Sequence, residues 1–174
     1  MQWSRLKKQV ESRFCDSLQK RVQLHTTRFD SKGEYGKFWI LLDRKEIFAA
    51  HDVTSLVEQS RIAKHLQEIN NCSNPSGAQR AAYYETLHTA KDIAHQKNIW
   101  SRYECEGALR QYLNLSIEEA LLSENDFIKA LSLFDARTGK RRLAALETNS
   151  YQHLLVRQFY TVRCEAENLK PVSS

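Results

Sequence analysis

A short stretch near the N-terminus holds the residue types that a metal-dependent nuclease uses. Asp43 and Lys45 form an Asp-x-Lys pair, Asp30 lies thirteen residues upstream, and Glu11 precedes both. Two carboxylates could hold Mg²⁺, while the lysine orients the attacking water or stabilises charge on the phosphate. The Asp43-Arg44 pair is equally typical of a hairpin turn, where Asp bonds the local backbone. A Mg²⁺-dependent nuclease centred on Asp43 and Lys45 is therefore one alternative, and it alone calls for a cofactor.

The positive charge of the chain is concentrated in its first quarter. Residues 1–45 carry eleven Lys or Arg against five Asp or Glu, and residues 46–174 carry fifteen against sixteen, so the net charges are +6 and −1. This asymmetry favours an anionic partner such as nucleic acid, although a solvated face explains it equally well. His25, Tyr35 and Trp39 are available to stack on bases, but tryptophan is more often a core residue. The predicted nucleic-acid contacts of this segment are Arg5, Lys7, Lys8, Arg13, Lys20, Arg21, Arg28 and Lys37.

A second basic sequence, Thr138-Gly139-Lys140-Arg141-Arg142, resembles a phosphate-binding turn. Helix N-termini and cationic side chains both attract anions. The sequence lacks the upstream glycine and the preceding strand of a P-loop, and a solvated turn between two helices is the alternative. Lys140, Arg141 and Arg142 join the predicted nucleic-acid contacts on this basis.

Three potential metal ligands, His88, Asp92 and His95, recur at positions i, i+4 and i+7. This spacing places them on one side of a helix, where they could bind a divalent metal. A solvated helix flank explains the same spacing, and no further ligand set is visible in the sequence. We therefore expect no resident metal, with these three residues as the candidates.

The composition favours a single helix-rich domain. The chain has 174 residues, and only seven of them are Pro or Gly, so long helices are expected. Its four cysteines contain no C-x-x-C pair, which argues against a structural zinc and indicates free thiols in a reducing compartment. The sequence has no apolar leader and no run of about 18 apolar residues. A cytoplasmic protein without membrane contact is the expectation.

The elements that must position these residues begin with a helix and three strands. Ser4 could cap a helix that ends near residues 16–17. Residues 21–29 then alternate with period two, residues 38–42 form a short apolar run, and a tight turn at 43–46 leads into 47–49. This order predicts a three-stranded antiparallel meander.

After Asp52, which could cap a second helix, the pattern becomes almost wholly helical. The buried face of that helix is predicted to hold Val53, Leu56, Val57, Ala63, Leu66 and Ile69. A linker at 70–77 precedes a third helix at 78–97, with Tyr83, Leu87, Ala90 and Ala94 on its buried stripe. Capping boxes at Ser101 and Ser116 introduce shorter helices near 102–113 and 117–123, and the last helix is expected at about 151–166.

Several segments, in order and spacing, resemble a family of small bacterial proteins of unknown function. They are WSRLKKQVESRFCDSL (3–18), EYGKFWILLDRKEI (34–47), LSIEEALLSEN (115–125), LFDARTGKRRL (133–143) and LLVRQFYTVRCEAE (154–167). Two positions depart from the pattern, since Gly is expected at Arg44 and Pro at Leu154. The resemblance implies a bacterial cytosolic setting and no particular activity.

Together these observations predict an α+β fold in which an N-terminal helix and a three-stranded antiparallel meander pack on a mostly helical C-terminal body. One domain is expected over 1–174, with a basic α-β-β-β-α segment at 1–70 and a helical segment at 78–168. The leading functional hypothesis is a non-enzymatic binding or regulatory protein whose basic N-terminal face contacts an anionic partner, most plausibly nucleic acid. The alternatives are the nuclease and a protein-interaction accessory or inhibitor module that uses the helical half.

Overall fold

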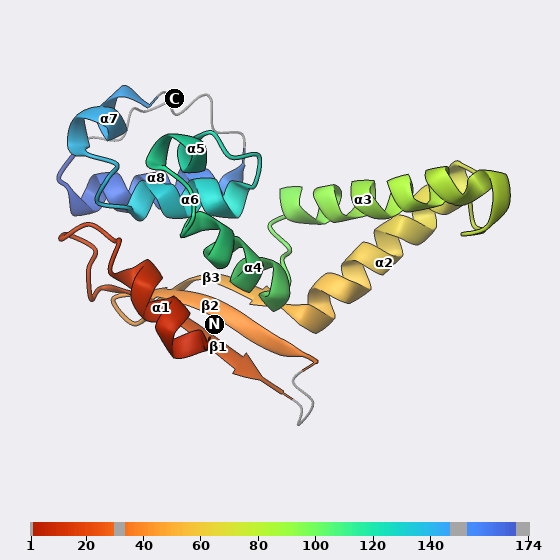
Figure 1. Cartoon of the computed structure of the whole chain (residues 1–174), viewed down its shortest axis with the longest axis horizontal. Coiled ribbons are helices and arrows are strands. Elements are labelled where there is room, and N and C mark those ends of the chain that lie inside the picture. The colour runs from red at the N-terminus through yellow and green to blue at the C-terminus, as the bar shows by residue number, and fades with distance from the viewer. Residues whose placement is uncertain (1, 30–33, 147–152, 170–174) are drawn as a thin grey trace.

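The computed structural model describes residues 2–29, 34–146 and 153–169, and its architecture is the predicted α+β one. Helix α1 (Trp3–Glu11) leads into a three-stranded sheet, and a body of helices follows (Figure 1). The body contains α4 (Arg102–Tyr112), α5 (Ile117–Leu121), α6 (Asp126–Phe134), α7 (Lys140–Ala145) and α8 (Leu154–Ala166). No helix among these described residues is long and apolar enough to cross a membrane.

The sheet is the predicted antiparallel meander, with strands β1 (Val22–Arg28), β2 (Gly36–Leu42) and β3 (Lys45–His51) in sequence order. Successive side chains of each strand point alternately to its two faces. Leu24, Phe38 and Phe48 point into the core, where rings of α1 and α6 meet them. Their neighbours in sequence therefore point the other way, onto an outer face.

The turn between β2 and β3 would suit the glycine that was expected at position 44. Asp43 and Arg44 both have positive φ, +49° and +69°. A two-residue hairpin of this kind needs left-handed backbone at both central positions, which glycine adopts most easily. Position 154 is likewise the first residue of α8, where proline is well tolerated. Both departures thus fall where the expected residue fits the backbone.

The core lies between the inner face of the sheet and helices α1, α4, α6 and α8. Helix α6 is buried along most of its length, and the rings of Phe134 and Phe159 stack across α6 and α8 at 4.4 Å between centroids. Both predicted capping boxes are confirmed: the Ser101 and Ser116 side chains accept the N–H of Glu104 and Glu119, whose carboxylates return to the two serine N–H groups. These caps set the starts of α4 and α5.

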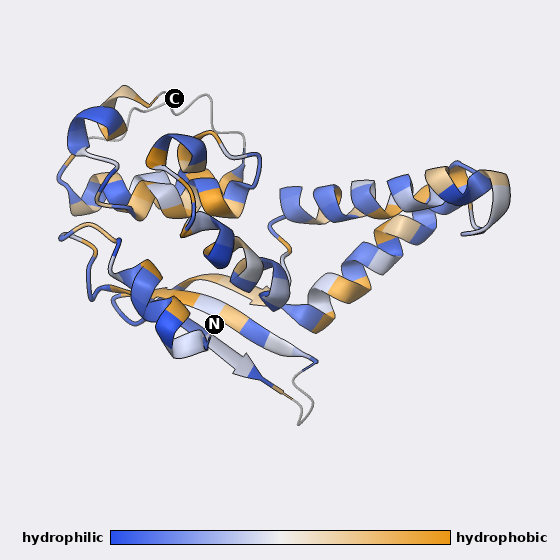
Figure 2. Ribbon diagram, viewed as in Figure 1, coloured by the Kyte–Doolittle hydropathy of each residue, from blue (hydrophilic) through white to orange (hydrophobic). Residues whose placement is uncertain are grey.

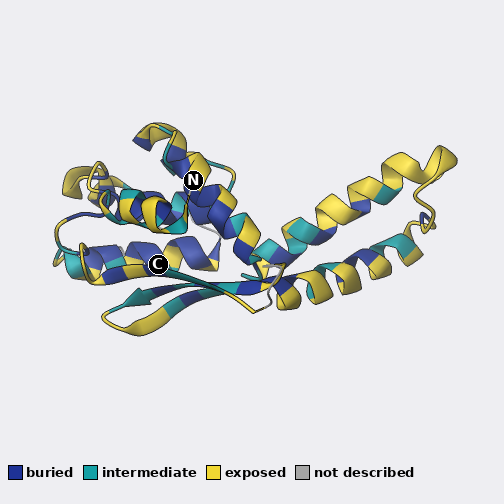
Figure 3. Ribbon diagram, turned by 60° about the horizontal axis from the view of Figure 1, so that its bottom comes forward, coloured by how far each residue is buried: buried dark blue, intermediate teal, exposed yellow. Residues whose placement is uncertain are grey.

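Helices α2 (Asp52–Ile69) and α3 (Arg80–Gln96) form an antiparallel arm that projects away from the body (Figure 1). A short 3-10 turn (Gly77–Gln79) precedes α3. A small apolar cluster of Ile62, Ala63, Ala90 and Ala94 holds the two helices together. Much of the arm is hydrophilic and exposed, in contrast to the body (Figures 2 and 3).

The prediction of a buried stripe on α2 was wrong at four of its six positions, whereas Ala63 is buried as predicted. Val53, Leu56, Val57 and Ile69 are about half exposed or more, between 49% and 62%. Helix α2 leaves the body as an arm and meets only α3 along most of its length, so one narrow strip near Ile62 is buried. On α3 the predicted burial of Ala90 and Ala94 is confirmed, whereas Leu87 is exposed.

Several predicted helix ends were also wrong. Helix α1 begins at Trp3, without a side-chain cap from Ser4, and ends at Glu11 rather than near 16–17. Helix α3 begins at Arg80 and α8 at Leu154, where the His153 side chain accepts the N–H of Leu155. The described part of the last helix is thus capped by a histidine, a residue type that capping rules do not favour.

A fully buried guanidinium joins the end of the sheet to the arm and the body. Arg102 Nε lies 3.0 Å from Asp52 Oδ2, and Arg102 Nη1 lies 3.0 Å from Glu106 Oε1. Asp52 also accepts the backbone N–H of Arg102 at 2.8 Å, so its carboxylate satisfies α4 and does not cap α2 as predicted. A Cβ on Gly36 would lie 2.1 Å from the Thr27 carbonyl oxygen and 2.8 Å from Arg102 Nε. Glycine at this position therefore lets the guanidinium pass over the strand ends.

Candidate nucleic-acid interface

A basic groove of about 610 Å³ runs between α1 and the start of β1. One side is built from residues of α1 that share a helix face at i, i+3, i+4 and i+7. The other side comes from the loop before β1 and from β1 itself. The lining residues are Ser4, Lys7, Lys8, Glu11, Ser12, Gln19, Lys20, Val22 and Gln23. Three lysines against one glutamate give this groove a positive balance, and a polyanion is the ligand class that it suits.

The single carboxylate of the groove is already engaged. Glu11 Oε1 accepts the backbone N–H of Leu24 at 2.7 Å and lies 3.6 Å from Lys7 Nζ. Leu24 belongs to the edge strand β1, whose outward N–H groups need partners outside the sheet. Glu11 thus ties α1 to the edge of the sheet and neutralises part of the Lys7 charge, whereas Lys8 and Lys20 have no acidic partner among the residues that the structure describes.

Lys20 stands in the groove on an unusual backbone. Its φ is +69°, in the left-handed region where a residue with a Cβ pays about 1 kcal/mol. The N–H groups of Arg21 and Val22 both reach the Leu18 carbonyl oxygen, and Leu18 is fully buried, so the turn that holds Lys20 is anchored in the core. A glycine would meet this geometry at less cost, and the lysine at this site instead directs a charge toward the groove.

Among the predicted basic contacts, five side chains have no ion-pair or hydrogen-bond partner in the part of the chain that the structure describes. The others are engaged to different degrees: Arg21 with Asp43, Lys37 with Glu46, Lys140 with Glu167, Arg142 with Glu118, and Lys7 with Glu11. Exposed pairs of this kind are weak and exchange readily with an incoming phosphate. The unpaired side chains are Arg5, Lys8, Lys20, Arg28 and Arg141.

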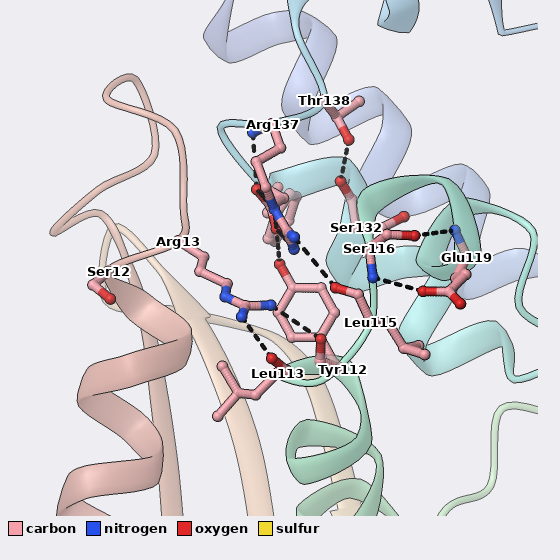
Figure 4. Close-up of polar contacts among 12 residues, drawn as sticks. Ser12, Arg13, Tyr112, Leu113, Leu115, Ser116, Glu119, Ser132, Arg137 and Thr138 are labelled. Carbon is pink, nitrogen blue, oxygen red and sulfur yellow. Dashed lines mark hydrogen bonds and ion pairs between the residues drawn. The ribbon is translucent and has the colours of Figure 1, made fainter.

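Arg13, by contrast, is part of the scaffold. Its two terminal nitrogens donate to the carbonyl oxygens of Tyr112 and Leu113 at 3.0 and 2.6 Å, and its guanidinium lies over the Tyr112 ring (Figure 4). Arg137 reaches the Leu115 carbonyl oxygen from the other side at 3.2 Å. The C-terminal end of α4 presents unsatisfied carbonyls and negative dipole charge, which these two guanidinium groups compensate. Arg13 therefore has little donor capacity left for a ligand.

Behind Arg13 lies a Tyr–Asp–Arg network in which Tyr112 and Asp135 are buried and Arg137 is exposed. The Tyr112 hydroxyl donates to Asp135, and Arg137 Nη2 lies 2.7 Å from the same carboxylate (Figure 4). Burial, and then the Asp135 charge, raise the pKa of Tyr112 far above its usual value. Burial opposes the ionisation of Asp135, but hydrogen bonds from Arg137 and Tyr112 lower its pKa below the usual value. The network is fully paired and serves to fix the end of α4.

The outer face of the sheet carries two of the three predicted stacking residues, whereas Tyr35 lies before β2 and is exposed. His25 and Trp39 are direct partners in the β1–β2 register, and their rings stack at 5.2 Å with planes 13° apart. Burial, and then the nearby Lys7 charge, lower the pKa of His25, outweighing the opposite effect of Glu11. Trp39 is half-buried on the outer face, not in the core. The aromatic pair thus adjoins the lysine groove across β1.

The nuclease candidates that the structure describes, Glu11, Asp43 and Lys45, have separate surroundings and form no metal-binding group. Asp43 lies in the β2–β3 turn, where Arg21 binds both of its carboxylate oxygens at 3.0 and 2.7 Å. That hydrogen bond from Arg21 lowers the pKa of Asp43. Glu11 serves Leu24 as described above, Lys45 is exposed at the start of β3, and Asp30 lies outside the described residues. In the described chain no group of three or more His, Cys, Asp or Glu side chains could hold a metal ion.

The candidate ligands of α3 have different surroundings. His88 and Asp92 are exposed, whereas His95 lies against Trp100 at 3.9 Å between ring centroids and contacts Glu104 at 3.1 Å. Burial would raise the pKa of Glu104, but hydrogen bonds from His95 and Ser101 hold it at about 2. His95 thus joins the arm to the start of α4.

All four cysteines are free and buried. Burial raises the pKa of the Cys105 thiol, and a buried thiol with a raised pKa is a poor nucleophile. Cys15 contacts the Ser17 hydroxyl at 3.1 Å. The Cys15 and Cys105 thiols are both buried, whereas a catalytic thiol would reach solvent. The cysteines therefore pack as small core residues.

The sequence singled out the lysines of the groove but not its uncharged lining. Ser4, Gln19 and Gln23 carry no local signal, and only the approach of α1 to β1 brings them together. The sequence could not show that the Arg13 donors are already engaged, because their acceptors are carbonyl groups about a hundred residues away. Of the two stacking residues, His25 could be placed on the outer face by the alternation of β1.

Comparison with known proteins gives one match. The model of the SF0329 protein family matches residues 2–164, which is most of the chain. No curated protein and no solved structure matches it.

Proposed function

We propose that this chain, which belongs to the SF0329 protein family, is a binding protein of the bacterial cytoplasm that holds nucleic acid in the groove between α1 and β1. The observation that carries the proposal is the groove itself, in which Lys7, Lys8 and Lys20 converge from a helix and a strained turn. Phosphate groups are the anions that such a row of lysines attracts most strongly in a cell.

The free charges favour a long anion over a single phosphate group. Lys8 and Lys20 stand on opposite walls of an open groove, and Arg28, at the far end of β1, has no partner among the described residues. Ser12 of this groove also lines a neighbouring hollow with Arg110. A backbone with repeated phosphates can meet these separated cations in turn, and a small anion cannot.

The first experiment measures the binding of a single-stranded oligonucleotide at low salt. Lys8→Ala and Lys20→Gly should each weaken binding, by roughly two- to fivefold, the worth of one exposed ion pair. Lys20→Gly is the sharper variant, because glycine suits the left-handed backbone and the fold should lose no more than about 1 kcal/mol of stability. Weaker binding by a variant of unchanged stability then reports the charge alone.

Lys64→Ala is the matched control, since Lys64 is an exposed lysine of the arm with no side-chain partner in the described chain. It removes the same charge far from the groove and should leave binding nearly unchanged. Equal losses in Lys20→Gly and Lys64→Ala would reject the groove as the site and leave only a diffuse charge effect.

A protein-interaction accessory or inhibitor module is a second candidate, favoured by apolar side chains exposed at the base of the arm. Val53, Leu56 and Val57 are 49–58% exposed, and Leu56 lines a hollow beside the Tyr103 ring. Exposed clusters of this kind often mark protein interfaces. This candidate predicts that one stoichiometric protein co-purifies with the chain and is lost in Leu56→Glu; retention of that protein by the variant would count against the arm.

A further inference from the structure

The outer face of the sheet is built in three rows that cross the strands. The pairing registers place His25, Trp39 and Ala49 in the middle row, with Thr27, Lys37 and His51 on one side and Gln23, Leu41 and Glu46 on the other. Helices α1 and α4 pack on the opposite face, and Figure 3 shows the body helices on one side of the sheet. The three residues of the middle row are half-buried on this outer face.

The middle row leaves one face of an indole uncovered by any ring. His25 stacks on the side of Trp39 that faces β1. On the β3 side the direct partner of Trp39 is Ala49, whose side chain is a single methyl group. His25 Nε2 has no hydrogen-bond partner in the described chain, so its stacking on Trp39 is the contact that places the ring. From β1 to β3 the middle row thus holds the His25 ring, the Trp39 ring and the methyl group of Ala49. We call the position over Ala49 the gap.

A salt bridge crosses this gap. Lys37 Nζ lies 5.3 Å from the centre of the Trp39 ring and 2.6 Å from Glu46 Oε2. Lys37 and Glu46 belong to the two outer rows, so their side chains must extend along the sheet over the middle row to meet. The pair is partly exposed, and an exposed pair is easily broken.

We propose that the face of Trp39 turned toward Ala49 is a stacking site for an unpaired base, so that the nucleic acid bound by this protein is single-stranded. The inference rests on the proposed function and deepens it. The base enters over Ala49, Lys37 leaves Glu46 for a phosphate of the same strand, and the backbone continues across β1 to Lys7, Lys8 and Lys20.

The dimensions of the sheet agree with this path. Neighbouring strands lie about 4.8 Å apart, so Trp39 is roughly 10 Å from the outer edge of β1. Even at the 3.4 Å axial spacing of a stacked duplex strand, no more than about three nucleotides separate the stacked base from the lysine groove, and an extended single strand needs fewer. The bases of a duplex are already stacked and paired, and only an unpaired base can turn its face to Trp39.

The test compares an oligothymidylate of about ten nucleotides, within the usual span of such sites, with an abasic oligomer of the same phosphate number. The thymidylate should bind more tightly by roughly 5- to 150-fold, the worth of one stacked base. It should also quench tryptophan fluorescence, and the abasic oligomer should not. Trp39→Phe should keep most of the affinity while losing the quenching, because phenylalanine still stacks and the reporter is gone.

Two further variants change the surroundings of the gap and leave Trp39 itself unsubstituted. Ala49→Ile fills the space beside the indole with a residue that strands favour, and it should bring the thymidylate down to the affinity of the abasic oligomer. Glu46→Gln releases Lys37 and removes a competing carboxylate, so binding should tighten by roughly two- to fivefold. A charge-only site predicts no effect of Ala49→Ile on either oligomer.

The outcomes separate the two proposals. Equal binding of thymidylate and abasic oligomer, or tighter binding of a duplex than of a single strand, would overturn the stacking site and leave the lysine groove standing. No binding of any oligomer at low salt would overturn both. If the wild-type protein prefers the thymidylate to the abasic oligomer and Ala49→Ile abolishes that preference, the stacking site beside Ala49 is supported.

Discussion

Replacing Asp52 tests how the sheet, the arm and the body are held together. The Asp52 carboxylate accepts the N–H of Arg102 at 2.8 Å, the Arg102 Nε–H at 3.0 Å and the N–H of Tyr103 at 3.4 Å. Asp52→Ala removes a carboxylate partner from a fully buried guanidinium, and breaking a buried pair in this way costs about 3–5 kcal/mol. Asp52→Asn keeps an oxygen that can accept backbone N–H groups while losing the charge, so its cost should fall between zero and that value.

Urea unfolding followed by circular dichroism measures this loss. With an m-value of about 2 kcal/mol per molar, the midpoint of Asp52→Ala should fall by roughly 2 M. Glu58→Ala is the matched control, because Glu58 pairs with Arg61 on the exposed surface of the same helix, and such pairs contribute about 0–1 kcal/mol. A midpoint for Asp52→Ala that equals that of Glu58→Ala would refute the buried pair as the joint.

Three other predictions concern the same framework. Gly36→Ala should lower the urea midpoint by more than the same substitution at a surface glycine would, since the added Cβ would overlap the Thr27 carbonyl and Arg102. An unchanged midpoint would contradict the packing. The pKa of Glu104 is about 2 in the folded chain against an ordinary 4.5, so its stabilisation is complete above pH 4.5 and is lost as pH falls toward 2. Urea midpoints measured across that window should fall less steeply in Glu104→Gln, and parallel curves would count against the shift. Tyr112→Phe should cost about 1–2 kcal/mol in the same assay, because the buried hydroxyl bonds Asp135; a neutral variant would show that Arg137 alone satisfies that carboxylate.

The meander was predictable because alternation in β1 and the turn residues after β2 are local signals. The orientation of β2 was not, since Phe38–Leu42 is an unbroken apolar run that gives no preference between its two faces. Pairing with β1 decides it, and places Phe38 inside and Trp39 outside. The Ala49 gap follows from that register and so could not be seen in the sequence.

The arm and the buried charges lay beyond local patterns. Apolar residues of α2 follow helical spacing, yet which of them are buried depends on how far the arm projects from the body. Arg102 carries no sign of full burial, and the glycine that admits it stands sixty-six residues earlier. The lysines of the groove were predictable as charges. That Lys8 and Lys20 have no acidic partner in the described chain depends on where the carboxylates of other elements lie.

The salt dependence of oligonucleotide binding tests the central claim most directly. Three lysine contacts to a single strand predict a slope of about −2 in log affinity against log salt, which is a loss of roughly 20-fold between 50 and 200 mM. In the double variant Lys8→Ala/Lys20→Gly the slope should become shallower by about 1.4, the share of the two contacts removed. A wild-type slope near zero, or a slope that the double variant leaves unchanged, would contradict nucleic-acid binding by the α1–β1 groove.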